Sequence, residues 1–146
     1  MPLAEISPLE ARSQMVIAGN GDRILHVTFV GEHHRSHGVQ MQSRLQDAVA
    51  SERPLGVLID LLKYEYEFGN DVSVLFLAGW HRKSKTLVPT CIVAIGKTRA
   101  SLESLYRAGS FELEPYLSFA ESAVEALAWL SKALDAPAFH EPDKVR

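Results

Sequence analysis

Apolar and polar positions along the chain follow two repeats, one typical of strands and one typical of helices. The clearest segment is 55–61, where the apolar run Val57-Leu58-Ile59 ends at Asp60. An unbroken apolar run is typical of a parallel strand that helices cover on both faces. Open α/β sheets keep their functional surface beyond the carboxyl ends of such strands. The polar residues after this strand are therefore expected at a working edge of the sheet.

The same patterns predict five strands and four helices. The expected strands span 14–18, 24–30, 55–61, 90–95 and 111–113. The first two should form a hairpin, because the Gly-Asn-Gly-Asp turn between them tolerates positive φ. Helical spacing of apolar residues predicts helices that begin at Ser36, Asp71, Arg99 and Ser118. The order ββαβαβαβα implies an α/β fold with a mostly parallel sheet of four to five strands and an N-terminal antiparallel hairpin.

End signals refine these helices. Ser36 and Asp71 are candidate N-caps, and Ser118 with Glu121 three residues later matches a capping box. Gly109 stands where a C′ residue belongs. The second helix is expected to run to Trp80 and to end in a group of cations, which consists of His81, Arg82, Lys83 and Lys85.

Length and composition indicate one globular domain. The chain has 146 residues, of which 47% are hydrophobic and 23% charged. We expect the domain to span 12–134, preceded by an N-terminal arm over 1–11 and followed by a mobile tail over 135–146. The two ends are rich in proline, and the tail also in charge.

The formal net charge of −3 argues against nucleic-acid binding, which would require a strongly basic face. No apolar run is long enough for a spanning helix, and no signal peptide is evident, so the expected location is cytoplasmic without membrane insertion. Cys91 lies in the apolar run Cys-Ile-Val-Ala-Ile and is expected to be a buried, unreactive thiol.

The element order and several short motifs resemble the STAS domain, the SpoIIAA-like fold of anti-sigma-factor antagonists, over about 14–132. The family's V-x-x-D-L strand corresponds to Val57-Leu58-Ile59-Asp60-Leu61. A helix ending in Gly109, a short strand at 111–113 and the E-A-x-x-W pattern at 125–129 follow in the family's order. The chain resembles a divergent, uncharacterised branch of this superfamily.

The resemblance implies a regulatory protein as partner, for which an anti-sigma-factor-like kinase is one candidate. In the family a loop serine in a D-S-[ST]-G string receives a phosphate that switches partner binding. Here the loop reads Gly69-Asn70-Asp71-Val72-Ser73, which lacks that string and leaves Ser73 as the nearest candidate phosphoacceptor.

A partner surface is predicted around the loop after the third strand, because aromatic residues alternate there with acidic ones and aromatics anchor interfaces. Its members are Asp60, Tyr64, Tyr66, Phe68, Asn70, Asp71 and Ser73. A homodimer through the edge hairpin or an exposed helix face is also open.

Other polar groups have simpler interpretations. The loop that contains His33, His34 and His37 is expected to be solvated, with metal binding as the alternative. Asp60 is expected to accept bonds from loop amides and Asp71 to cap a helix, with acid–base chemistry by the pair as the alternative.

The chain lacks a G-x-S-x-G elbow, a P-loop and a G-x-G-x-x-G fingerprint. The sequence therefore predicts no enzymatic activity and no cofactor. The leading hypothesis is a non-enzymatic interaction module. A small-molecule or lipid carrier of STAS-like fold and a metal-binding protein remain the alternatives.

Overall fold

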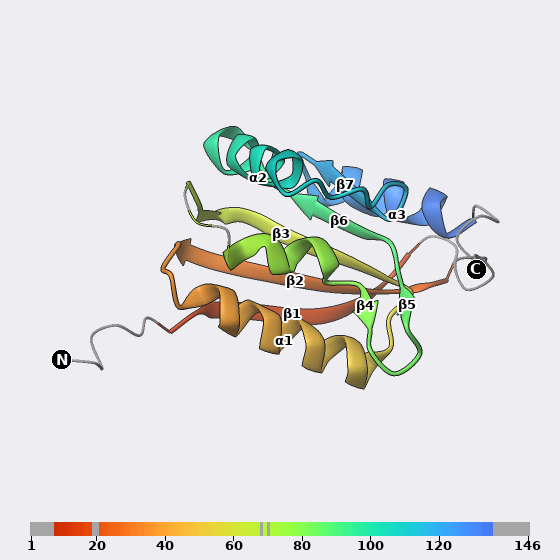
Figure 1. Ribbon diagram of the computed structural model, residues 1–146. Helices are drawn as coiled ribbons and strands as arrows, with labels where there is room; N and C mark the ends of the chain where they lie inside the picture. The colour runs from red at the N-terminus through yellow and green to blue at the C-terminus, as the bar shows by residue number, and fades with distance from the viewer. Residues whose placement is uncertain (1–7, 19–20, 68, 70, 136–146) are drawn as a thin grey trace.

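The computed structural model describes residues 8–18, 21–67, 69 and 71–135. Its centre is a five-stranded sheet with the order β1-β2-β3-β6-β7 (Figure 1). β1 pairs antiparallel with β2, and the other neighbouring pairs are parallel. The strands span Glu10–Ile17, Arg23–Glu32, Gly56–Glu65, Thr90–Val93 and Leu117–Ala120. The sheet confirms the predicted α/β architecture, including the N-terminal hairpin.

Four helices within the described residues cover the sheet. α1 (His37–Glu52), the 3₁₀ helix η2 (Asp71–Leu77) and α2 (Gly96–Ala108) pack on one face. α3 (Ala123–Asp135) packs on the other (Figure 1).

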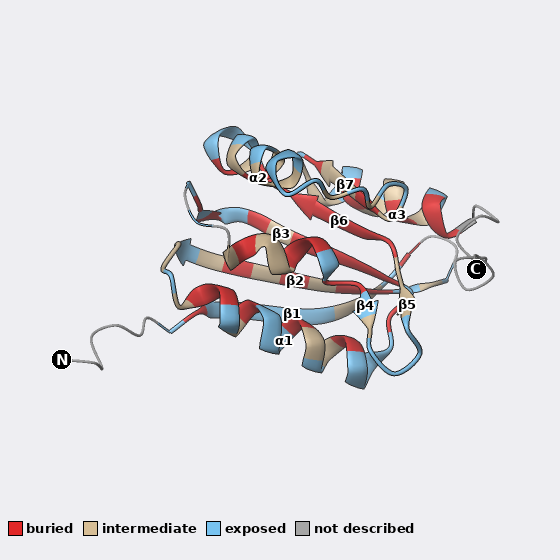
Figure 2. Cartoon of the chain, in the orientation of Figure 1, coloured by how far each residue is buried: buried red, intermediate tan, exposed pale blue. Residues whose placement is uncertain are grey.

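The core forms two clusters because side chains alternate along each strand. On β3, Ile59 and Leu61 point into the larger cluster under α1, η2 and α2, whereas Leu58 points toward α3. Figure 2 shows the buried residues concentrated on β3, on β6 and on the inner faces of the helices. β3 is the central strand of the sheet, with β2 on one side and β6 on the other.

The predicted second helix was wrong beyond Leu77. η2 ends there, and Trp80–His81 (β4) pairs with Thr86–Leu87 (β5) in a small hairpin. The buried residues Val72 and Leu75 are three apart, which fits the repeat of a 3₁₀ helix. Gly79 then lies so close to the chain that a Cβ atom would approach Val88 O to 2.3 Å. The basic residues expected at a helix end lie instead on the hairpin.

The predicted fifth strand at 111–113 was also wrong. Phe111 stacks on Tyr106 and contacts Phe76, with ring centroids 5.6 and 5.0 Å apart. The fifth strand of the sheet is instead β7, at Leu117–Ala120. Ser118 therefore lies in β7 and does not cap a helix. The capping interaction occurs one turn later, where Ser122 Oγ accepts a hydrogen bond from Glu125 N at 3.1 Å.

Other boundaries differ in detail. Ser36 is the N-cap residue of α1 but makes no side-chain capping bond. Gly109 has φ −83°, and the left-handed residue is Ser110 with φ 58°. β1 begins at Glu10, inside the range assigned to the arm. α3 reaches Asp135, the first residue assigned to the tail; residues 1–7 and 136–146 lie outside the described residues, and their character stays a prediction.

Among the described residues no helix has the length and apolar character needed to cross a membrane.

Two positions on α1 provide a matched test of the packing. Leu45 is 2% exposed against the sheet, whereas Val39 is 73% exposed. We expect Leu45→Ala to lower the free energy of unfolding by about 2–5 kcal/mol, because it removes buried contacts and leaves a cavity. Val39→Ala should change it by less than about 0.5 kcal/mol. Urea denaturation of both variants measures the difference, and equal losses would contradict this packing.

Candidate functional site

A polar cluster lies where β2 and β3 end side by side. The parallel register pairs Gly31 with Tyr64 and Glu32 with Glu65, so the chain after β2 passes the end of β3. The Tyr64 hydroxyl lies 2.7 Å from His33 Nδ1 and 2.8 Å from His37 Nδ1. Tyr64 is 2% exposed, which places this polar contact inside the larger hydrophobic cluster. A buried hydroxyl needs hydrogen-bond partners, and the two histidines supply them.

Asp71 connects this cluster to two helices. Its Oδ1 lies 3.2 Å from His33 Nε2, and its Oδ2 accepts a hydrogen bond from Gly38 N at 3.2 Å. Gly38 lies in the first turn of α1, so Asp71 caps α1 from η2. A Cβ atom on Gly38 would lie 2.6 Å from Asp71 Cβ, so the close approach requires glycine.

The hydrogen bonds define a proton arrangement. His37 Nδ1 accepts from His34 N at 3.2 Å, so the Tyr64 hydroxyl donates to His37 and its oxygen accepts from His33 Nδ1. His33 Nε2 faces the Asp71 carboxylate. His33 therefore bridges the Tyr64 hydroxyl and the Asp71 carboxylate through its two ring nitrogens.

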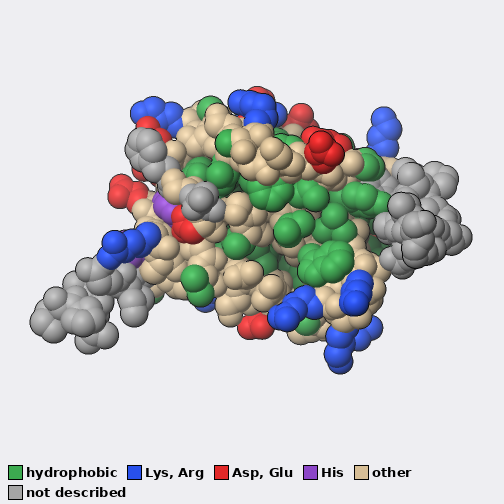
Figure 3. All heavy atoms as spheres, viewed as in Figure 1, with side chains coloured by type: hydrophobic (Ala, Val, Ile, Leu, Met, Phe, Trp, Pro, Cys, Tyr) green, Lys and Arg blue, Asp and Glu red, His purple; other side chains and the backbone are tan. Residues whose placement is uncertain are grey.

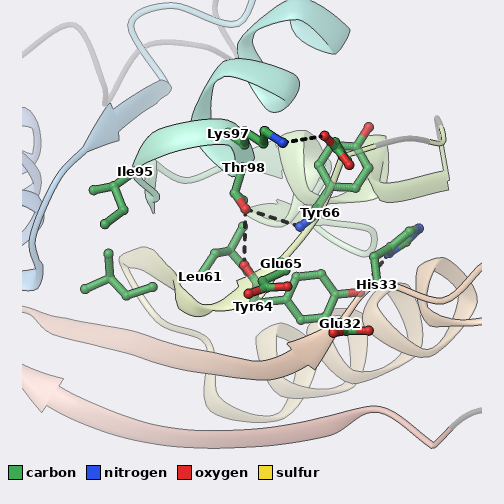
Figure 4. A pocket seen from close by; sticks show the side chains of 11 residues that line it. Glu32, His33, Leu61, Tyr64, Glu65, Tyr66, Ile95, Lys97 and Thr98 are labelled. Carbon is green, nitrogen blue, oxygen red and sulfur yellow. Dashed lines mark hydrogen bonds and ion pairs between the residues drawn. The ribbon is translucent and has the colours of Figure 1, made fainter.

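A cleft of about 800 Å³ opens beside this cluster, between the end of β3 and the start of α2 (Figure 4). Thr98 joins its two walls: Thr98 Oγ1 accepts from Tyr66 N at 3.2 Å and donates to Tyr64 O at 3.3 Å. Tyr66 in turn donates its hydroxyl to Gly69 O. The floor of the cleft is therefore held by buried hydrogen bonds.

The rim of the cleft is predominantly acidic. Glu32, Glu65 and Glu67 line it, and Lys97 is the one cation among the described lining residues. Lys97 Nζ lies 3.2 Å from Glu67 Oε2 (Figure 4). This pair leaves Glu32 and Glu65, both exposed, as the uncompensated charges of the rim.

Burial raises the pKa of Tyr64 well above its ordinary value of 10.0, and the Asp71 carboxylate raises it further. The pKa of Tyr66 is raised by the same two causes. Both tyrosines are therefore neutral hydrogen-bonding groups. Burial likewise raises the pKa of Cys91 to about 12, which agrees with the predicted unreactive thiol.

The aromatic residues predicted as a partner surface are less exposed than expected. Tyr64 and Tyr66 are 2% and 5% exposed, so they form the floor of the cleft. Both rings pack in the larger hydrophobic cluster, although the acidic residues next to them in sequence are exposed. Phe68 and Asn70 lie outside the described residues.

Asp60 and Ser73, two other residues of the predicted partner surface, lie away from the cleft. Asp60 accepts a hydrogen bond from Leu62 N at 3.0 Å, as expected, and lies 3.6 Å from His26 on the α3 face. Asp71 lies on the opposite face, so the two carboxylates are not a pair. Ser73 is half-buried in η2 and borders a different hollow, with Trp80 and Leu77.

The prediction that the histidine loop is solvated was wrong for His33 and His37. His37 is 3% exposed, and the side chain of His33 is 11% exposed, because both turn inward to Tyr64. The described residues contain no group of three or more His, Cys, Asp or Glu side chains arranged to hold a metal.

Sequence reasoning missed Thr98, Gly38 and Lys97. No local pattern marks them, because their roles depend on α2 and η2 packing beside β3. The glycine in the first turn of α1 is the one visible signal, since glycine is unfavourable within a helix.

Solved structures of similar shape identify the fold. An anti-sigma-factor antagonist from Mycobacterium paratuberculosis matches with TM-score 0.55 and 15% identity over 84% of this chain and 95% of that one. The anti-sigma-factor antagonist SpoIIAA in its unphosphorylated form matches with TM-score 0.58 and 11% identity over 84% and 97%. The chain has the SpoIIAA-like fold of STAS domains.

A third structure with this fold is an uncharacterised protein of the DUF3478 family from Shewanella loihica PV-4. It matches with TM-score 0.55 and 19% identity over 86% of this chain and 97% of that one. No family model matches the chain, and no curated protein matches it. The likeness therefore concerns the SpoIIAA-like fold, and at these identities it shows nothing further.

Asp71→Ala tests the connection between η2 and α1. The variant removes both hydrogen bonds of the carboxylate, so we expect the free energy of unfolding to fall by about 1–3 kcal/mol. Asp47→Ala is the matched control, because Asp47 is an exposed residue of α1. Urea denaturation measures both. A loss no larger than that of the control would show that Asp71 does not hold the two helices.

Alkaline titration tests the burial of Tyr64. Its raised pKa means that the folded chain keeps a proton that the unfolded chain loses near the ordinary value of 10.0. Stability should therefore be intact below that pH and fall as the pH rises above it. Tyr64→Phe should reduce this alkaline loss, and the tyrosinate absorbance of the folded protein should lose its latest-titrating component. An unchanged titration curve would contradict the buried position.

Proposed function

We propose that this SpoIIAA-like domain is a non-enzymatic interaction module that binds a regulatory protein through the cleft at the carboxyl ends of β2 and β3. The observation that carries the proposal is the acidic rim of Glu32, Glu65 and Glu67 above a floor fixed by buried hydrogen bonds. Two solved structures of the same fold are anti-sigma-factor antagonists. Their role supports a regulatory partner here, of which an anti-sigma-factor-like kinase is one form.

The chemistry of the cleft favours recognition over catalysis. Tyr64 and Tyr66 are buried with raised pKa values, and their hydroxyls are engaged in hydrogen bonds. Such groups position a surface but do not exchange protons near neutral pH. No observation on the described residues supports the metal-binding or carrier alternatives.

The charge of the rim specifies the partner. Glu32 and Glu65 are exposed and have no ion-pair partner within the described part of the chain. Opposite charges across an interface raise association rates and exclude wrong partners. The surface that enters the cleft should therefore carry Lys or Arg side chains. Ser73 borders a different hollow, so its phosphorylation stays a separate prediction.

Neutralising the rim tests the proposal. The tagged double variant Glu32→Gln/Glu65→Gln and the wild type are isolated from the native cells, and bound proteins are quantified by mass spectrometry. We expect a regulatory protein that is retained by the wild type and reduced about tenfold by the variant, which corresponds to about 1.4 kcal/mol. Weaker binding of this protein at high salt would agree with a charged rim.

Glu10→Gln/Glu112→Gln is the matched control, because it removes two exposed carboxylates away from the cleft. It should retain the partner. Equal retention by both variants would refute the placement, and a rim-dependent partner without a regulatory role would refute the function.

A further inference from the structure

A second surface lies near the other end of α1, around the β4–β5 hairpin. Trp80 is 39% exposed and Leu77 is 46% exposed. Trp80 separates a hollow of about 370 Å³, which Val74, Leu77 and Phe111 border, from one of about 240 Å³. Figure 3 shows apolar side chains gathered on this face, with Lys and Arg side chains along its lower edge. We call Trp80, Leu77 and the basic residues Arg53, Arg82, Lys83 and Lys85 the Trp80 surface.

The charge of the Trp80 surface is opposite to that of the chain. The chain has a net charge of −3, yet no acidic side chain lines either hollow among the described residues. Arg53, Arg82 and Lys83 line the smaller hollow, and Lys85 follows on the hairpin. Within the described part of the chain none of the four has an ion-pair partner. The surface therefore presents uncompensated positive charge around an exposed tryptophan.

The hairpin that carries Trp80 is held in place. Trp80 pairs with Leu87, and Val88 N donates to Gly79 O at 3.0 Å. Ser84 Oγ bridges His81 Nδ1 and Thr86 Oγ1 at 2.8 and 2.7 Å. A backbone that is already held in place loses little conformational entropy when a partner covers it.

Two of the basic residues adopt backbone conformations that favour glycine. Arg53 and Lys85 have φ of 49° and 56°. Glycine or asparagine is usual at such positions, since larger side chains strain the backbone there. Arg53 lines the smaller hollow with Trp80, and Lys85 lies in the turn of the hairpin that carries Trp80, at positions where glycine would fit with less strain.

From this geometry we infer that the Trp80 surface binds an acidic amphipathic helix of a protein partner. Buried tryptophan and arginine are the residues that most often dominate protein interfaces. Apolar side chains one turn apart on the helix would enter the two hollows on either side of Trp80. Acidic residues on its flanks would pair with Arg82, Lys83 and Arg53. This surface is separate from the acidic cleft, so the inference does not rest on the function proposed for that cleft.

A protein helix fits this surface better than a membrane does. The hollows on either side of Trp80 match the separate side-chain anchors of a helix. A lipid surface has no such side chains to enter them.

Selection of a displayed peptide library tests the inference. The probes are peptides of about 16 residues with helical propensity, about 24 Å long at 1.5 Å per residue. They are selected on the full chain and counter-selected on Trp80→Ala. We expect the surviving sequences to carry apolar residues at i, i+3 or i+4 with Asp and Glu beside them. Their affinity should fall about 30-fold for Trp80→Ala and comparably for Arg82→Glu/Lys83→Glu, whose exposed positions leave the fold intact.

Matched controls separate the surface from general effects. Val39→Ala shortens an apolar side chain that is 73% exposed elsewhere on α1. Arg12→Glu/Arg44→Glu makes the same charge change away from Trp80. Both should bind the selected peptides as the wild type does, and the Glu32→Gln/Glu65→Gln variant of the cleft should as well.

Three results would overturn the inference. Survivors without acidic enrichment would exclude charge complementarity, and the absence of Trp80-dependent survivors would exclude a helix-binding site. Trp80-dependent binding to phosphatidylserine vesicles or to a single-stranded oligonucleotide, without peptide survivors, would assign the surface to a membrane or to nucleic acid instead.

Discussion

The buried hydroxyl of Tyr64 is the contact on which the carboxyl edge of the sheet depends. Tyr64 lies at the end of β3, and its hydroxyl contacts His33 in the chain after β2 and His37 at the start of α1. One hydroxyl therefore connects three segments. Asp71 extends these connections to η2 and to the backbone of α1. A buried polar group without its partners costs about 1–3 kcal/mol, so each member holds the others in place. The edge is consequently a rigid platform, although it is built from loops and helix ends.

This platform determines what the cleft presents. Tyr64 and Tyr66 supply the floor with their rings and backbone, while their hydroxyls point into hydrogen bonds. The charged side chains of Glu32 and Glu65 remain at the rim. The recognition proposed for this cleft would therefore depend on the charge of the rim and the shape of the floor.

α1 links the two surfaces of the domain. Its first turn contacts Asp71 beside the cleft, and its last residues precede Arg53 at the Trp80 surface. A helix of 16 residues spans about 24 Å, so the acidic cleft and the basic Trp80 surface are separated by most of the domain. The two proposed surfaces therefore differ in charge as well as in position.

The sequence by itself determined the layer architecture, because apolar runs of strand length and helical repeats are local properties. The hairpin, the central strand around Val57–Ile59 and the buried Cys91 were predicted from those patterns. The sequence predicted Ser118 as the last N-cap, but Ser118 pairs within β7 beside β6, and the cap is Ser122, which also precedes a Glu by three residues. The sequence could not show that Gly79 would end η2 against Val88 and turn Trp80 outward. The inward turn of His33 and His37 also required the tertiary structure, because their partner Tyr64 comes about thirty positions later and meets them only through the parallel register of β2 and β3.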